Sequence, residues 1–284
     1  MVLAVPCYLQ QGVVKLVKQR PLLDRIPPAG ERLIVYRNGS NIIIPYAYTI
    51  TDDGKVSWRK QEKEKAFAHG STPYGDGKVD ARKIKLSVYV KGETQAEYDQ
   101  KYNELLSNFA GSDYILTCGR EDRVYKVAAM TVTSQRYLKG FKQRWSDVDL
   151  TLLLADPFRY ASSPTVITQN YDADQTDAEI TFNNPSSVDV PLIWTFTPPV
   201  GGTVPSISIT HVESGQSFAL KDTLLTNPAV AVVNAEVGTV RRDTGNSLNT
   251  FSGVFLHALP GSNIFKYTGA ACKVDIAFTA RWFV

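Results

Sequence analysis

The sequence of 284 residues is poor in cysteine, and its three cysteines, Cys7, Cys118 and Cys272, lie far apart. An odd number of cysteines at these spacings fits neither a disulfide framework nor a zinc site. We therefore expect three reduced, partly buried side chains that pack as small hydrophobic groups.

Long hydrophobic segments are also missing. No run reaches 18 apolar residues, the length that suggests a membrane-spanning helix, so we expect no membrane insertion. The segment Met1–Cys7 lacks a basic flank and is too short in apolar residues for a signal peptide, which predicts synthesis in a cytoplasm. A net charge of +3 is too small to indicate nucleic acid as the main binding partner.

Catalytic motifs are absent as well. His69, His211 and His257 stand in three separate segments, and the sequence has no metalloprotease, nucleophile-elbow, phosphate-loop or dinucleotide motif. The acidic run Asp172–Asp177 lacks the glycine and the distant glutamate of a calcium loop. We therefore expect no catalytic residue, no cofactor-binding residue and no metal ligand.

The distribution of charge is the first positive signal. Residues 1–160 carry 25 Lys and Arg against 18 Asp and Glu, whereas residues 161–284 carry 6 against 10. The apolar run Val148–Leu154 ends just before Asp156 and Pro157, and proline cannot continue a central strand. This change of composition predicts two domains, residues 1–160 and residues 161–284.

Residues 1–160 show strand patterns around one helix. Asn38 and Gly39 separate two apolar runs and are typical of a tight hairpin turn, and Asp53 and Gly54 repeat the signal. Residues 80–90 alternate between apolar and polar side chains, which predicts a strand with one buried face. Residues 69–78 contain three glycines and a proline and indicate a polar loop.

The helix is predicted at about residues 93–110. Thr94 and Glu97 match a capping box, the next apolar residues follow one helical face, and Gly111 is placed to end the helix. Short strands follow, near Tyr114, from Arg123 and from Trp145. The prediction is a β-rich α+β domain, a β-sandwich or split barrel with one helix.

Residues 161–284 contain short β-type runs and no good helical pattern. The runs are separated by turn clusters rich in Gly, Pro and Asn, one of which is expected at residues 260–263. Such spacing is typical of a sandwich or barrel, and we interpret this half as a β-sandwich. The whole chain is thus predicted to be mainly β. Trp194 and Trp282 lie among apolar neighbours, which favours burial over a role in stacking against sugars.

The segment from Arg136 to Trp145 interleaves cationic and aromatic side chains. Its composition suits either phosphate contact with base stacking or a protein–protein contact, in which Arg, Tyr and Trp are enriched. We favour the protein contact. The candidate subunit or partner interface therefore comprises five residues: Arg136, Tyr137, Phe141, Arg144 and Trp145.

A series of segments carries a family resemblance over nearly the whole chain. The segments are His69–Gly70, Arg82–Gly92, Glu93–Ala110, Arg123–Val127, Asp156–Tyr160, Gly253–Asn263 and Val274–Trp282, of which the last is expected to be the closing strand. In this order they resemble the distal tail (Dit) proteins of long-tailed bacteriophages with non-contractile tails. The resemblance implies a ring-forming first domain and a galectin-like β-sandwich as the second.

What the resemblance implies about function is structural. Such proteins assemble in the virion tail as a hexameric ring, single or stacked, that joins the tail tube and the tape measure protein to the tail tip or baseplate. DNA passes through the lumen of the ring without specific binding. The second domain projects outward and carries receptor-binding proteins or touches the host surface.

Two other functions stay open from the residues. The first is a carbohydrate-binding module that binds host-surface glycans. A role in a ring does not exclude this function. The second is a glycan hydrolase, which needs two carboxylates facing each other across a cleft. The carboxylate pairs in the sequence, such as Asp147 with Asp149, are equally explained by surface turns.

Overall fold

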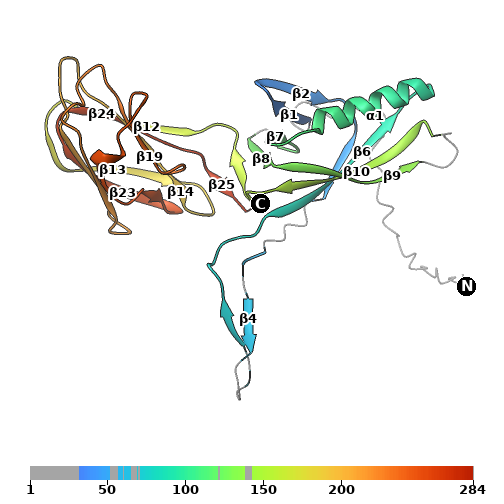
Figure 1. Cartoon of the computed structure of the whole chain (residues 1–284), viewed down its shortest axis with the longest axis horizontal. Helices are drawn as coiled ribbons and strands as arrows, with labels where there is room; N and C mark the ends of the chain where they lie inside the picture. Colours follow the sequence, from blue (N-terminus) through green and yellow to red (C-terminus); the bar gives the residue numbers. More distant parts are fainter. Residues whose placement is uncertain are drawn as a thin grey trace, which may run out of the picture.

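The computed structural model describes residues 32–51, 57–59, 61–64, 69, 71–120, 122–137 and 143–283. Over these residues the chain is mainly β, with α1 (Gln95–Phe109) as the one α-helix, as the sequence predicts. Figure 1 shows two bodies side by side, with the hairpin of β4 and β5 projecting away from both. Nothing in the described part of the chain is a helix able to cross a membrane.

The N-terminal body is built from two antiparallel sheets and α1 (Figure 1). Its first sheet, sheet A, has the strand order β2 (Ser40–Ile44), β1 (Leu33–Arg37), β7 (Tyr114–Thr117), β8 (Arg123–Val127), β11 (Arg159–Ala161) and β25 (Arg281–Trp282). Its second sheet, sheet B, has the order β3 (Tyr48–Thr51), β6 (Arg82–Lys91), β10 (Trp145–Leu154) and β9 (Ala129–Tyr137).

The core of this body follows from the alternation of its strands. On β6, Ile84, Leu86, Val88 and Val90 are fully buried, and the alternate residues of β10 are buried beside them. Side chains from sheet A and from α1 close the same hydrophobic cluster. The predicted strand over residues 80–90 is therefore confirmed, and one face of it is the floor of the core.

The local signals for the turn and the helix are confirmed. Asn38 and Gly39 have φ values of 51° and 78° and join β1 to β2 in register, as a tight hairpin turn requires. The Thr94 side chain accepts a hydrogen bond from the Glu97 backbone N–H at 3.1 Å. The Glu97 carboxylate in turn accepts a hydrogen bond from the Glu93 N–H at 2.8 Å. The reciprocal bond of the capping box is therefore made with Glu93, the residue before the N-cap Thr94.

The C-terminal body is a β-sandwich of two antiparallel sheets. The first, sheet C, has the order β12 (Thr165–Tyr171), β24 (Cys272–Phe278), β15 (Ile193–Thr197), β18 (Ala231–Asn234), β19 (Thr239–Arg242) and β20 (Gly245–Asn246). The second, sheet D, has the order β13 (Gln175–Asn184), β23 (Gly261–Gly269), β16 (Ser206–His211), β17 (Ser217–Lys221) and β21 (Phe251–Gly253). Smaller elements are β14 (Val190–Pro191), which pairs with β22 (His257–Ala258), and the 3-10 turn η1 (Leu248–Thr250).

Aromatic rings fill the space between sheets C and D. Trp194 is fully buried, and its ring centroid lies 5.3 Å from Phe265 and 6.0 Å from Phe218 on the opposite sheet. Phe182 stacks on Phe265 at 5.4 Å. These contacts join the two sheets in one hydrophobic cluster, as in sandwiches in general.

Two sequence expectations for this fold were wrong. The loop predicted over residues 69–78 contains β5 (Ser71–Tyr74), because β4 (Gln61–Glu64) provides a pairing partner that a local pattern does not reveal. The turn predicted at residues 260–263 opens β23 instead, since Gly261 has φ 92° and the following residues alternate between buried and half-buried. The turn signal at Asp53 and Gly54 lies outside the described residues.

The closing strand expected over residues 274–282 is divided between two sheets. β24 ends in sheet C at Phe278, and the chain then leaves the sandwich so that β25 pairs with β11 in sheet A. Sheet A therefore contains strands from both ends of the described sequence. The division into domains at residue 160 and the galectin-like character of the sandwich stay predictions.

Candidate assembly surface

Four of the five predicted interface residues lie at one end of sheet B. β9 reaches this end at Tyr137 and β10 begins there at Trp145, with Ser146 paired to Tyr137 and Trp145 paired to Lys91. We call Arg136, Tyr137, Arg144 and Trp145 the hairpin-end surface. Phe141 lies outside the described residues.

Arg136 is held on the outer face of sheet B by a carboxylate. Its Nη2 atom donates to Asp149 Oδ2 at 3.1 Å, and the same carboxylate accepts from the hydroxyls of Ser87 and Ser134, each at 2.6 Å. Burial would raise the pKa of Asp149, but the hydroxyl hydrogen bonds and the Arg136 charge lower it below its ordinary value. Asp149 therefore stays ionised and orients Arg136.

Tyr137 lies on the opposite face, beside α1. Its ring centroid is 6.1 Å from that of Tyr98, and its hydroxyl accepts from Gln135 Nε2 at 3.1 Å. The same Gln135 amide donates to the Tyr98 hydroxyl at 2.7 Å, and that hydroxyl lies 2.6 Å from Ser146 Oγ. Tyr137 is 45% exposed although this network fixes its position.

Arg144 and Trp145 connect the hairpin end to the start of α1. The Arg144 guanidinium donates to the Glu93 carbonyl, and the Gly92 N–H donates to the Arg144 carbonyl at 2.9 Å. The Lys91 ammonium lies 5.3 Å from the centre of the Trp145 ring, within the range of a cation–π contact. The hairpin end is thus tied to the helix by backbone as well as by side chains.

The four residues do not form one flat patch. Because cross-strand neighbours share a face, Tyr137 lies with Ser146 on the helix side of sheet B, and Trp145 lies with Lys91 on the outer side. The surface wraps round the end of the sheet. It presents cations and rigid aromatic rings on a fixed backbone, the composition that protein interfaces favour, and it contains no nucleophile with a base.

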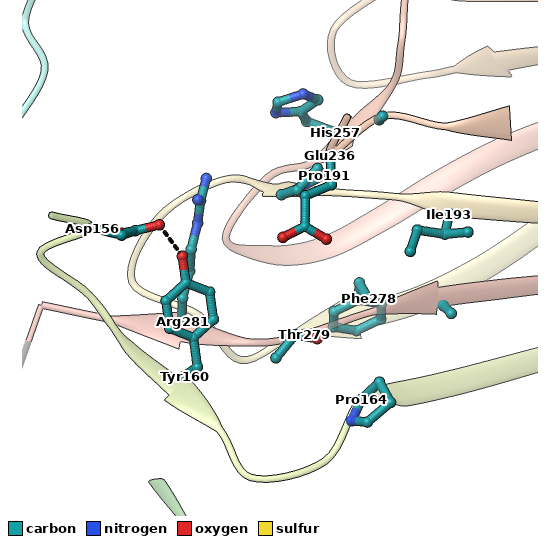
Figure 2. Close-up of a pocket in the computed structure, with 12 residues that line it drawn as sticks. Asp156, Tyr160, Pro164, Pro191, Ile193, Glu236, His257, Phe278, Thr279 and Arg281 are labelled. Carbon is teal, nitrogen blue, oxygen red and sulfur yellow. Dashed lines mark hydrogen bonds between the residues drawn. The ribbon is translucent and has the colours of Figure 1, made fainter. Parts of the chain in front are cut away.

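A cavity of about 290 Å³ lies between the two bodies. Figure 2 shows Asp156, Tyr160 and Arg281 on one side, with Glu236 and His257 across from them. The Tyr160 hydroxyl donates to Asp156, and burial together with this bond raises the Tyr160 pKa. No sequence pattern indicates this cavity, because its lining residues come from several segments between Asp156 and Arg281 that only the fold brings together.

The polar groups of the cavity are occupied by neighbours. His257 Nδ1 lies 2.9 Å from Asp189 Oδ2, and the Glu236 carboxylate lies 3.7 Å from Lys126 Nζ. Across the described residues no group of three or more His, Cys, Asp or Glu side chains is placed to hold a metal ion. The cavity is therefore described best as polar space at the junction of the bodies.

The other residues singled out in the sequence have local structural roles. His211 is buried between Ser214 Oγ at 2.8 Å and Asn263 Oδ1 at 3.1 Å, and His69 is exposed. Trp194 is fully buried, as predicted. Trp282 is only partly buried, and its indole N–H donates to the Pro185 carbonyl at 2.8 Å. Because the Trp194 ring is buried, the two tryptophans form no shared platform for a sugar.

Known proteins resemble this chain in fold but not in sequence. No protein-family model and no curated protein sequence matches the chain. Among solved structures, the Dit protein of phage SPP1 matches with a TM-score of 0.67 and 13% identity, over 88% of this chain and 98% of that one. The chain has the fold of a phage distal tail protein.

The likeness to the Dit fold extends across both bodies of the chain, because it covers nearly all of the SPP1 protein. That protein is described as a paradigm of the hub adsorption apparatus in phages that infect Gram-positive bacteria. The baseplate of phage P2 matches over 88% of this chain at 6% identity, but with a TM-score of 0.45 it carries no further argument. At 13% identity the SPP1 match shows the fold alone.

Proposed function

We propose that this chain is a structural distal tail protein of a bacteriophage or prophage. Six copies close into a ring at the end of the tail tube, and DNA passes through the lumen without specific contacts. The ring joins the tube and the tape measure protein to the tail tip or baseplate. The observation that carries this proposal is the match of fold with the SPP1 Dit protein over both bodies of the chain.

The surfaces of the N-terminal body suit self-association. Among the described residues β2 is an edge strand of sheet A, and the outer face of β1 and β2 exposes 42% of Tyr36 and 49% of Ile43. Edge strands and exposed apolar side chains favour pairing with another chain. A ring uses two different surfaces of each copy, so such a contact closes by rotation without leaving a free edge.

The hairpin-end surface is the proposed contact with a neighbouring copy or with another tail protein. Arg136, Tyr137 and Trp145 are the residue types that dominate the energetics of protein interfaces. Their backbone is held by sheet B and by α1, so little conformational entropy is lost when a partner binds. Receptor-binding or host-surface contacts are assigned to the C-terminal sandwich.

The oligomeric state of the purified chain tests the proposal directly. Size-exclusion chromatography with light scattering should give six times the chain mass of 31.4 kDa, or a multiple of it for stacked rings. Negative-stain images should show an annulus with a central opening. A chain that stays monomeric at high concentration, with no annulus in the images, would contradict the ring.

Substitutions at the hairpin end test the assignment of the surface. The double change Tyr137→Asp and Trp145→Asp should abolish the ring, because it places two charges in a desolvated contact. The change of Phe141 to Asp together with Trp145→Asp is expected to act in the same way. Val237→Asp with Leu224→Asp is the matched control, since both side chains are about two-thirds exposed on the sandwich. If the first variant still forms rings, the hairpin-end surface is not a contact between copies in the ring.

A further inference from the structure

The chain crosses between the two bodies twice, and the two crossings are paired. The outgoing segment follows β11, and the returning segment leads from β24 into β25. Arg159 pairs with Trp282 and Tyr160 with Arg281, and the Ala161 N–H donates to the Ala280 carbonyl at 2.8 Å. The returning segment ends with residues 281–283, which contact both bodies.

The contacts with the sandwich are hydrogen bonds that each use a backbone group on at least one side. The Arg281 N–H donates to Ser186 Oγ at 2.9 Å, and the Ser187 N–H donates to the Arg281 carbonyl at 3.1 Å. The Arg281 guanidinium donates to the Asp189 carbonyl, with Nε at 3.0 Å. The indole N–H of Trp282 completes this set through the Pro185 carbonyl.

Besides the backbone pairing of β25 with β11, side chains contact the N-terminal body. The Arg123 guanidinium lies over the Trp282 ring, 4.1 Å from its centre. The Phe283 ring lies 5.5 Å from Phe158 and 5.8 Å from Trp58. The Phe283 carbonyl accepts a hydrogen bond from Arg82, which is only 5% exposed.

Outside these residues the junction is loosely filled. The cavity of about 290 Å³ separates the bodies beside Arg281, as Figure 2 shows. The ion pair of Lys126 with Glu236, 3.7 Å long and about half exposed, adds about 0–1 kcal/mol at most. Bodies joined by a small, polar junction move relative to each other by default.

We infer that residues 281–283 form a strap that sets the orientation of the C-terminal sandwich on the N-terminal body. With the strap in place, two paired crossings and the Phe283 contacts hold the angle between the bodies. Without it, one covalent crossing at residues 162–164 remains, and the sandwich turns about that segment. In the described part of the chain β25 is an edge strand with two paired residues, so the strap can open locally while the rest of sheet A stays formed.

The test is a distance measurement between the bodies. Spin labels are attached at Glu104→Cys on α1 and at Val200→Cys, a position 96% exposed on the sandwich, with Cys7→Ser to remove a third site. Cys118 and Cys272 are buried. Dilution with unlabelled chain removes distances between copies. The unaltered strap should give one narrow distance distribution.

The strap variant is Arg123→Ser with Phe283→Ser, which leaves every hydrogen bond between residues 281–282 and the sandwich in place. It should broaden the distribution and add longer distances. The matched control, Arg241→Ser with Phe255→Ser, changes the same residue types within the sandwich and should keep the distribution narrow. A narrow, unshifted distribution in the strap variant would overturn the inference.

Hydrogen exchange provides a second readout. Opening of the strap exposes the Ala161 amide, so its exchange should accelerate at least about tenfold in the strap variant, equivalent to about 1.4 kcal/mol. Phe283→Leu alone should give a smaller acceleration of exchange at Ala161. This single variant replaces the double variant in the test if the double variant does not fold. Unchanged exchange at Ala161 in a folded variant would count against the strap. Neither measurement depends on whether the ring forms.

Discussion

The two bodies of this chain bury their cores in different ways. The C-terminal sandwich closes around aromatic rings, with Trp194 contacting Phe218 and Phe265 across the two sheets. The N-terminal body packs mainly aliphatic side chains from β6 and β10 against sheet A and one helix. It leaves Tyr36 and Ile43 half exposed beside an edge strand. Exposed apolar side chains also occur on the sandwich, where Leu224 and Val237 are about two-thirds exposed, so the two bodies differ in how their cores are packed and not in whether apolar surface is left open.

The charge distribution agrees with this contrast. The basic excess lies in residues 1–160, which include the hairpin-end surface, and the acidic excess lies in the sandwich sequence. The cationic excess is thus on the body that we assign to the ring. Under the proposed function, assembly and projection are assigned to two bodies whose cores are built differently.

The largest effects should separate the two cores. Trp194→Ala should destabilise the sandwich by about 3–5 kcal/mol, and Leu150→Ala should destabilise the N-terminal body by about 2–5 kcal/mol, because each removes a fully buried side chain. Calorimetry should show each change lowering a different transition. A single transition that both changes lower equally would mean that the bodies unfold as one unit.

A buried hydroxyl should matter in one body and not in the other. Tyr98→Phe removes a partner of Ser146 and Gln135 and should cost about 1–3 kcal/mol. The buried Tyr171 hydroxyl in the sandwich has no hydrogen-bond partner among the described residues, so Tyr171→Phe should be neutral or slightly stabilising. Urea denaturation of both variants measures the difference. Equal losses would contradict the role of the Tyr98 network.

The capped helix α1 lies in the N-terminal body, and the described residues of the sandwich contain no α-helix. Thr94→Ala should destabilise this body by about 1 kcal/mol, because the Glu97 N–H loses its acceptor. Thr94→Ser keeps the hydroxyl and should restore most of the loss. Chemical denaturation followed by circular dichroism checks both variants, and a loss with Ser as large as that with Ala would exclude capping as the cause.

The smallest expected effect is on how the unfolding free energy changes at acidic pH. Burial would raise the pKa values of Asp149 and Asp275, but hydrogen bonds and nearby cations lower both overall. A lowered folded-state pKa gives stability above the unfolded value of about 3.9, and this stability is lost as pH falls through the folded value. Asp149→Asn and Asp275→Asn should each make the unfolding free energy less dependent on pH below about 4. Denaturation curves of the unaltered chain and of both variants from pH 6 to pH 2 test this.

Local patterns in the sequence predicted several elements because the determining interactions are short-range. The alternation on β6, the hairpin at Asn38 and Gly39, and the capping box at Thr94 all depend on neighbours within a few residues. The failures are of the opposite kind. β5 needs β4 as a partner, and Gly261 begins a strand because β13 and β16 lie on either side of β23.

The candidate surface was predicted only in part. The residue types from Arg136 to Trp145 indicated an interface, but only the pairing of β9 with β10 shows that Tyr137 and Trp145 face opposite sides of sheet B. The strap was not predicted. β25 is two residues long, too short for any periodic pattern, and it was interpreted as the end of a longer strand.

The sequence by itself determined the mainly β character, the position of the one described helix and the faces of the long strands, since these depend on local backbone preferences and alternation. The tertiary structure alone decided that residues 281–283 return to the N-terminal body and that the hairpin end joins α1. Both depend on contacts between segments from about 50 to 200 residues apart, which become favourable only once the two cores have formed.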